Sequence, residues 1–172
     1  MPDAVTPPAK SSAIGKGGAR VLGNRTLMRA PIWLYRARLG FLFGSRVLML
    51  EHIGRKTGTK RYVVLEVIGH PSPDVYVVAS GFGARAQWFR NLMANPGVRV
   101  SVAGQVHRAA TARQLPTADA DAVLAEYVRQ HPRAWAKFKN ILENTLGTPI
   151  SEHDTELPMV ELRLDPATSV RR

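Results

Sequence analysis

The chain has 172 residues, no cysteine and a formal net charge of +11. This length suits one domain with a sizeable core, and the lack of cysteine excludes disulfides, thiolate metal sites and a cysteine nucleophile. No stretch approaches the roughly 20 apolar residues that span a bilayer, and the start lacks the basic-then-apolar order of a secretory signal. We therefore expect a cytoplasmic protein.

The positive charge is concentrated in residues 1–61, which hold twelve Lys and Arg residues against two acidic residues. A basic half indicates an anionic partner, which is a nucleic acid, a membrane surface or a phosphorylated ligand. Aromatic residues do not alternate with the basic cluster as stacking platforms would, so we do not expect nucleic-acid binding. The alternative interpretation is an ordinary soluble protein with its charge on the surface.

The N-terminal region divides into a tail and a helix. Residues 1–20 are rich in Pro, Ser, Gly and Ala, which predicts a flexible tail. Residues 24–38 predict a helix capped by Asn24 and kinked at Pro31. We favour a helix that covers one end of the fold. The alternative is a basic surface helix resting on anionic lipid, which would give peripheral membrane contact and a membrane-associated protein.

Six apolar runs bounded by turn residues predict strands. The expected strands are 46–53, 60–68, 74–80, 98–102, 105–112 and 157–164. The expected helices are 87–94, about 118–129 and 133–146. Tight turns between strands imply antiparallel pairing, and six strands can close on themselves to remove their edges. We predict a mainly β (α+β) fold, a six-stranded antiparallel barrel with peripheral helices, as one domain over 21–165 with a tail at 166–172.

The loop between the first two strands, GRKTGTKR at 54–61, places four cations beside two glycines and two threonines. A loop that only turns would not need four charges that repel one another. Exposed backbone N–H groups and guanidinium forks suit phosphate, so we interpret the loop as an anion site built from Arg55, Lys56, Arg61 and backbone N–H groups. The glycine order and the following strand differ from a nucleotide-hydrolase phosphate loop. The alternative is a solvated hairpin tip.

A second glycine-rich segment, 81–86, matches the G-x-G-x-x-A dinucleotide fingerprint. We reject that interpretation, because the next helix has about two turns and no parallel βαβ unit or acidic partner follows. Glycines here still let backbone approach a flat ligand, to which Ser80 and Arg85 can add a hydrogen bond and a charge. Trp88 is more typical of a core, whereas Asn91 needs hydrogen-bond partners if it is buried.

The five histidines show no spacing typical of a metal site, and no serine nucleophile elbow is present. We therefore expect no bound metal and no acid–base side chain at the centre of the site.

Four motifs together resemble the deazaflavin-dependent nitroreductase family of split β-barrel flavin and deazaflavin oxidoreductases, found mainly in actinobacteria. They are GRKTGTKR at 54–61, ASG at 79–81, WFxNLxANP at 88–96 and VRVSVAG at 98–104. The resemblance covers about 24–115 and the last strand. It implies an FMN-binding-like split barrel and the cofactor F420, an 8-hydroxy-5-deazaflavin with an acidic glutamyl tail.

By position, the resemblance implies that the basic loop binds the F420 phosphate, that the next strand lies against the deazaflavin ring, and that later residues complete the pocket. The implied cofactor-binding residues are Arg55, Lys56, Thr57, Arg61, Val63, Val64, Leu65, Ser80, Arg85, Trp88 and Asn91. Ser80 and Tyr127 are assigned as catalytic neighbours of the ring. Gly81 departs from relatives with nitroimidazole activity, which often have lysine there.

The resemblance implies hydride transfer from reduced F420 to a small-molecule acceptor, which is a quinone, an enone or a nitro compound. Such a reaction needs no side-chain base, and the protein is expected as a monomer or homodimer. Two alternatives stay open: a split barrel that binds FMN or haem, and a non-enzymatic carrier of F420 or lipid.

Overall fold

The computed structural model describes residues 44–166. The expected tail over 1–20, the expected helix over 24–38 and its suggested membrane contact therefore lie outside the described residues, as do residues 167–172. The expected domain boundaries stay predictions. Among the described helices, none is both long and apolar enough to span a bilayer.

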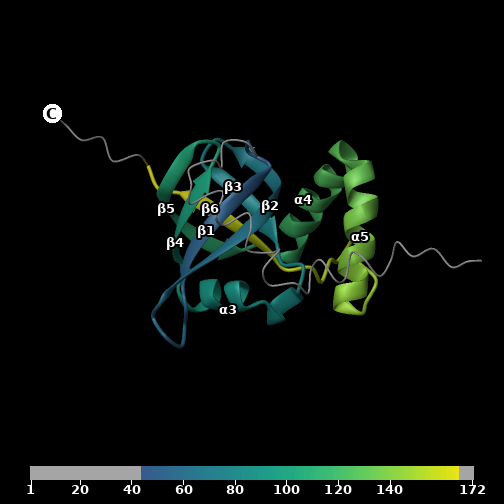
Figure 1. Ribbon diagram of the computed structural model, residues 1–172. Coiled ribbons are helices and arrows are strands. Elements are labelled where there is room, and N and C mark those ends of the chain that lie inside the picture. The colour runs from purple at the N-terminus through teal and green to yellow at the C-terminus, as the bar shows by residue number, and fades with distance from the viewer. Residues whose placement is uncertain (1–43, 167–172) are drawn as a thin grey trace, which may run out of the picture.

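Within residues 44–166, six antiparallel strands form a closed barrel in the order β1-β2-β3-β6-β5-β4 (Figure 1). The strands are β1 Val47–Ile53, β2 Lys60–Ser72, β3 Val75–Ala79, β4 Gly97–Val102, β5 Gln105–Gln114 and β6 Met159–Leu164. Pairing of β1 with β4 closes the sheet, so every strand has two neighbours and no edge is left open. The predicted six-stranded antiparallel barrel is confirmed.

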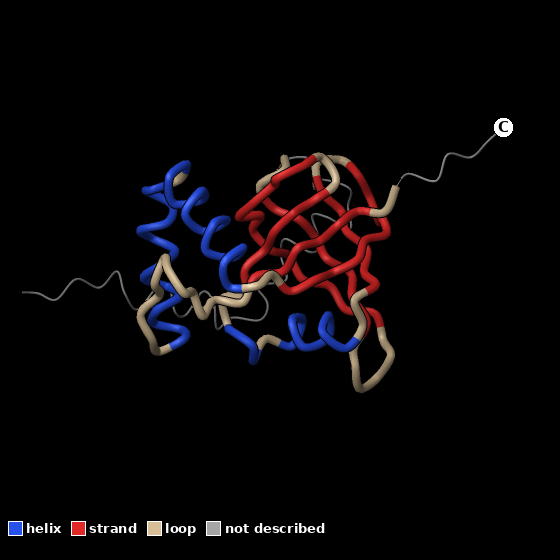
Figure 2. Tube along the Cα trace, turned by 180° about the vertical axis from the view of Figure 1, so that it is seen from behind, coloured by secondary structure: helices blue, strands red, loops and turns tan. Residues whose placement is uncertain are grey.

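The helices lie outside the barrel, as predicted. They are the short 3-10 helix η3 Gly83–Arg85, α3 Gln87–Ala94, α4 Thr117–Gln130 and α5 Pro132–Leu146. The two views in Figures 1 and 2 show α4 and α5 together on one side of the barrel and α3 beneath one end. Pro132 stands at the start of α5, where its missing N–H costs nothing, and Gly147 ends that helix with a φ of 77°.

Strand β2 is longer than predicted, because it continues past residue 68 to Ser72. The segment between the expected strands 60–68 and 74–80, which contains the sequence HPS, was expected to form a tight connection. In the structure, register shifts on both sides of Gly69 let the strand bend and still pair with β3, with Ser72 opposite Val75. A β-bulge of this kind is difficult to recognise from a strand pattern alone.

Alternating side chains of the strands point into the barrel, where they form one apolar core closed at one end by α3. Its buried members from the strands include Leu48, Leu50, Tyr76, Val78, Val100, Val102, Val160 and Leu162, and those from α3 are Trp88, Phe89 and Leu92. A second core lies between the outer face of the sheet and helices α4 and α5. It includes Val77, Leu124, Tyr127, Trp135, Leu142 and Met159.

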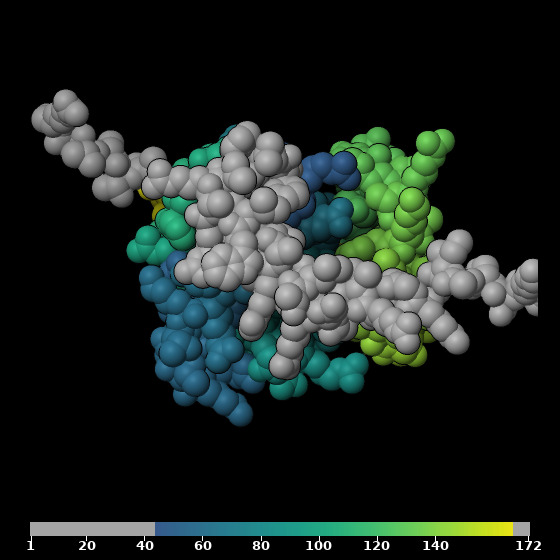
Figure 3. Space-filling model, in the orientation of Figure 1, coloured from purple at the N-terminus to yellow at the C-terminus, as the bar shows by residue number. Residues whose placement is uncertain are grey.

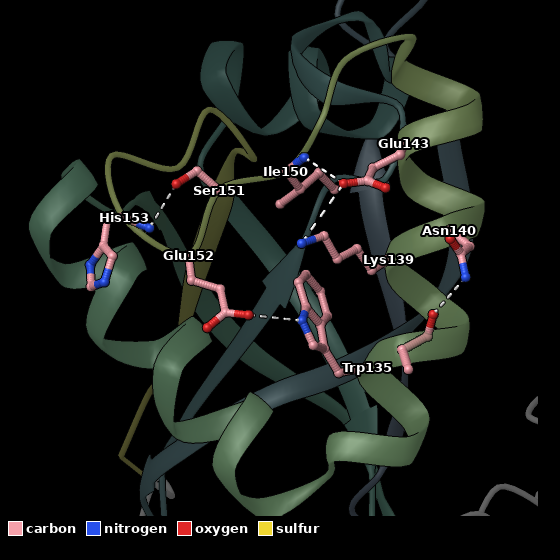
Figure 4. A network of polar contacts seen from close by, with 9 residues as sticks. Trp135, Lys139, Asn140, Glu143, Ile150, Ser151, Glu152 and His153 are labelled. Atoms are coloured by element: carbon pink, nitrogen blue, oxygen red, sulfur yellow. Dashed lines mark hydrogen bonds and ion pairs between the residues drawn. The ribbon is translucent and has the colours of Figure 1, made fainter.

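Polar contacts fix the segment that returns from α5 to β6 (Figure 4). The indole Nε1 of Trp135 donates to the Glu152 carboxylate at 3.3 Å, and Glu143 accepts from the Ile150 N–H at 2.9 Å. Further along, Asp121 of α4 accepts from the N–H groups of Asp154 at 2.7 Å and Thr155 at 2.9 Å. The Asp121 carboxylate therefore ties this segment to the start of α4.

We expect Asp121→Ala to lower the free energy of unfolding by about 1–3 kcal/mol, because it removes the acceptor of two charge-assisted hydrogen bonds. Urea unfolding measures the change. Asp119→Ala is the matched control, since Asp119 is exposed in the first turn of the same helix. An equal decrease in the free energy of unfolding in the two variants would show that the negative charge near the helix start stabilises the fold, and that the hydrogen bonds to Asp154 and Thr155 do not.

Candidate functional site

The β1–β2 loop, residues 54–59, is a closed turn that projects from the molecule at the lower left of Figure 3. The Gly54 N–H donates to the Thr59 carbonyl at 2.8 Å, and the N–H groups of Thr57 and Gly58 donate to the Gly54 carbonyl. Gly58 has a φ of 66°, a conformation that favours glycine. Because these amides already donate within the loop, they are less available to a ligand. Binding of an anion here therefore depends more on side chains than the sequence indicated.

A pocket of about 80 Å³, partly open to solvent, lies between this loop and α3. Its lining residues are Gly54, Arg55, Lys56, Thr57, Arg61, Gln87 and Asn91. The structure thus brings together five of the predicted cofactor-binding residues. Gln87 was not predicted. Its position four residues before Asn91, which places both side chains on one face of α3, was the signal available in the sequence.

Arg55 is held by oxygens of α3 that carry no charge. Its Nη1 donates to Asn91 Oδ1 at 2.9 Å and to Gln87 Oε1 at 3.1 Å, and its backbone N–H donates to the same Asn91 oxygen at 3.1 Å. Asn91 is only 3% exposed, so these bonds supply the partners that a buried amide requires. They orient the Arg55 guanidinium without neutralising it.

The four cations of the basic loop divide into two groups. Within residues 44–166, Arg55, Lys56 and Arg61 line the pocket and form no ion pair. Lys60 instead points to the outer face of the barrel, where it pairs with buried Glu51 at 3.1 Å. Burial raises the pKa of Glu51, but hydrogen bonds, led by that from Lys60, and nearby positive charges outweigh this and lower it overall. Three of the four charges thus remain available to a ligand.

Gly54 allows Arg61 to lie close to the loop. A Cβ at this position would stand 2.8 Å from Arg61 Nε and 3.0 Å from Thr57 Oγ1. The first contact is shorter than real Cβ atoms show and the second is tight, so a side chain at position 54 would require Arg61 to shift and would crowd Thr57. Gly54 therefore helps to shape the site, although the sequence analysis noted it only as one of two glycines beside the charges.

His52 lies directly behind the pocket and was also missed. It is 4% exposed, and its Nδ1 is 3.2 Å from Asn91 Nδ2. Since the Asn91 oxygen accepts from Arg55, the amide nitrogen must donate here, which leaves His52 Nδ1 unprotonated and the ring proton on Nε2. Burial, and then the positive charge of Arg61, lower the pKa of His52 from 6.5 to about 4. The ring is therefore neutral at pH 7.

The lowered pKa of His52 predicts a loss of stability in acid. The unfolded chain takes up a proton at this ring below about pH 6.5, whereas the folded chain does so only near pH 4. Stability is therefore complete above pH 6.5 and decreases by up to about 3 kcal/mol as the pH falls to 4. Urea unfolding of wild type and His52→Gln at pH 7.5 and 4.5 measures this effect. The free energy of unfolding should decrease less in the variant than in wild type. Identical pH dependence would contradict the assignment.

The predicted ring-contact residues on β2 and α3 are partly or fully buried. Val63 and Leu65 pack toward the barrel interior, while Val64 alternates to the outer face. Trp88 belongs to the interior core and meets Phe89 edge to face at 6.1 Å between ring centroids. Trp88 thus contributes to the core, and the contacts of these residues with a cofactor stay predictions.

The two predicted catalytic hydroxyls already bond to protein acceptors. Ser80 is 0% exposed, and its Oγ donates to the Gly83 carbonyl at 2.7 Å. Tyr127 Oη donates to Glu66 at 2.9 Å, and burial, followed by this bond, raises the pKa of Tyr127 to about 12. Neither residue lines the loop pocket, and exposed Arg85 stands apart from it in η3. The catalytic roles of Ser80 and Tyr127 stay predictions.

The structure gives a physical reason for glycine at position 81. A Cβ there would lie 2.8 Å from Leu142 Cδ2 of α5, and Leu142 is buried. Helix α5 therefore occupies the space into which a side chain at this position would project. Glycine at position 81 and the packing of α5 are therefore parts of one local arrangement.

Solved structures with similar folds have low sequence identity to this chain. An F420-H2 dependent reductase, FDR-A, is 22% identical with a TM-score of 0.49, over 69% of this chain and 94% of that one. A domain-swapped dimer is 20% identical with a TM-score of 0.49, over 78% and 100%. Atu2129 from Agrobacterium tumefaciens str. C58, of unknown function, is 15% identical with a TM-score of 0.51, over 80% and 56%; this likeness concerns the fold alone.

A search of curated proteins found no match. The family model described as F420H(2)-dependent quinone reductase matches residues 27–151, well over half of the chain. This match spans the barrel strands β1 to β5, the basic loop and helices α3 to α5. It confirms the resemblance drawn from the sequence motifs: the chain belongs to the F420H2-dependent quinone reductase family.

Proposed function

We propose that this protein is an F420H2-dependent reductase whose β1–β2 loop holds the phosphate of the cofactor. One observation carries the proposal: three cations without ion-pair partners among the described residues, Arg55, Lys56 and Arg61, converge on one pocket. Such a concentration of charge is stable only at a solvated surface or beside an anion. The hydrogen bonds that fix Arg55 favour a bound anion over a solvated surface, because a solvated charge needs no fixed orientation.

The three cations offer an anion different kinds of contact. The guanidiniums of Arg55 and Arg61 present forked N–H donors that match two phosphate oxygens, whereas the Lys56 ammonium acts as a point charge. Thr57 lines the same pocket and hydrogen-bonds to Thr59 at 2.7 Å between hydroxyl oxygens. Because α3 holds Arg55 before a ligand arrives, little side-chain entropy is lost on binding.

The pocket, at about 80 Å³, is smaller than typical small-molecule sites, which measure roughly 300–1,000 Å³, so it suits the phosphate end of F420 rather than the whole cofactor. The ring would extend along β2, where Val63, Val64 and Leu65 follow Arg61. Ser80, Arg85 and Trp88 are the further candidates for ring contacts. F420 supplies the chemistry when reduced, which is a hydride donated to an electrophile. The residues of this chain bind and orient the ring and exclude water from it.

The favoured acceptor is a quinone, which the family name supports. Reduction of a quinone to a quinol takes a hydride and a proton, and bound reduced F420 would supply both, the proton by exchange through water. Enones and nitro compounds are further candidate acceptors.

Turnover with reduced F420 tests the proposal. Purified protein is mixed with reduced F420 and menaquinone, cyclohexenone or a nitroimidazole, and oxidation of F420 is followed by its absorbance. We expect oxidation with at least the quinone, and a higher KM for reduced F420 in Lys56→Ala. Tight F420 binding without turnover of any acceptor would favour the carrier alternative. Co-purification of FMN or haem, visible in the absorbance spectrum, would favour the alternative of a split barrel that binds one of these groups.

A further inference from the structure

We propose that His52 is a positioning residue of the anion site, which acts through Asn91 to orient the Arg55 guanidinium toward the pocket. His52 itself does not line the pocket. The inference rests on the proposed function, because it takes the pocket to be the site of the cofactor phosphate. It adds a residue that neither the family motif nor the loop sequence singles out.

The two ends of the Asn91 amide have almost the same shape but opposite hydrogen-bonding character. Its oxygen accepts two hydrogen bonds from Arg55, one from the backbone and one from Nη1. If the amide turned by 180°, its NH2 group would face these donors, and both bonds would be lost. Something must therefore favour one orientation of the amide over the other.

His52 supplies this preference. Its Nδ1 is 3.2 Å from Asn91 Nδ2 and acts as an acceptor only when it carries no proton. An acceptor at this place stabilises the amide with its nitrogen toward β1 and its oxygen toward Arg55. Both residues are almost fully buried, so water cannot readily replace His52 as the acceptor.

The strand pairing places His52 where it can have this effect. His52 is the last inward-facing residue of β1, in register with Arg61 of β2. The same strand continues directly into the loop, so one short hairpin carries Arg55, Arg61 and the imidazole that orients Asn91. A chain of three hydrogen bonds thus runs from the barrel interior, through Asn91 and Arg55, to Gln87 at the pocket.

Two substitutions separate positioning from packing. His52→Gln retains a side-chain acceptor, whereas His52→Leu fills space without one. We expect His52→Leu to weaken binding of F420 and of inorganic phosphate about tenfold, and His52→Gln to stay within about threefold of wild type. F420 fluorescence and ³¹P NMR titration measure the two ligands. His70→Leu is the control, because it removes a histidine of β2 that bonds the Val75 carbonyl away from the pocket.

A measurement on the unmodified protein does not depend on how the variants fold. ¹⁵N NMR of the His52 ring should show an unprotonated Nδ1 and a protonated Nε2 at pH 7. The opposite tautomer, or equal weakening by the Leu and Gln variants, overturns the inference. If wild type binds phosphate but not F420, the proposed function is contradicted. The phosphate affinities of wild type, His52→Leu and His52→Gln then decide the role of His52. Wild type that binds neither ligand contradicts both proposals.

Discussion

Replacing Lys56 and Arg61 together by alanine should weaken F420 binding by at least about 30-fold. Each charge-assisted hydrogen bond to a phosphate contributes roughly 1–3 kcal/mol, and the loss of two of them at 1 kcal/mol each corresponds to that factor. Both side chains are exposed and form no ion pair among the described residues, so the fold should lose little stability. The wild-type affinity should also fall with added salt, and the affinity of the double variant should fall less.

The matched control removes two charges elsewhere. Arg133 and Lys137 are exposed on α5, so Arg133→Ala with Lys137→Ala lowers the net charge by the same amount without touching the loop. This control should bind F420 as wild type does. Unchanged affinity in the loop variant, or the same loss in both double variants, would show that general surface charge rather than the loop attracts the cofactor.

Asn91→Asp should weaken F420 binding by about 100-fold or more, although it changes only one amide nitrogen to oxygen. The new carboxylate would form an ion pair with Arg55, whose Nη1 is now 2.9 Å from the amide oxygen. It would also place a negative charge on the pocket lining, where repulsion of a phosphate a few ångströms away costs about 1–4 kcal/mol. The net charge of the site would thus fall by one, and the new carboxylate would compete with the phosphate for the Arg55 guanidinium.

Asn95→Asp controls for the added charge, because Asn95 caps the same helix and is exposed. Its effect on F420 affinity should stay within a few-fold. Equilibrium titration of both variants, with urea unfolding to check that each is folded, gives the comparison. If Asn91→Asp bound F420 as tightly as wild type, Arg55 could not be a phosphate ligand held by Asn91.

Much of the barrel could be predicted because its strands have strong local signals. The runs that became β1, β3 and β4 are rich in Val and Leu and end at turn residues. The end of β2 could not be predicted, since a bulge at Gly69 lets the strand continue through a proline-containing segment. Such an irregularity depends on the pairing with β3 and not on local propensity.

The basic loop could also be predicted from the sequence, because its four charges had no local explanation. Which of them reach the pocket could not be predicted, since Lys60 pairs with Glu51 across the β1–β2 hairpin. Gln87 and His52 were missed for a similar reason: each matters through a contact with a residue more than thirty positions away in the chain. Long-range polar pairs leave no periodic signal.

The assignments of Ser80 and Tyr127 show how motif and structure differ. The resemblance placed both beside the ring, whereas each hydroxyl bonds to a protein acceptor, namely the Gly83 carbonyl and the Glu66 carboxylate. A hydroxyl in such a bond contacts a ligand only through its remaining lone pairs or after it gives up its acceptor. Sequence motifs identify positions, but they do not show which hydrogen bonds those positions make.

Parallel fluorescence titrations of the full chain with F420 and with FMN, each at low and at high salt, show whether the basic pocket holds a deazaflavin. We expect saturable F420 binding that weakens as salt is added, and weaker binding of FMN. The basic pocket explains the salt dependence, and family membership supports the preference for the deazaflavin. FMN binding as tight as that of F420, or no F420 binding at either salt concentration, would contradict it.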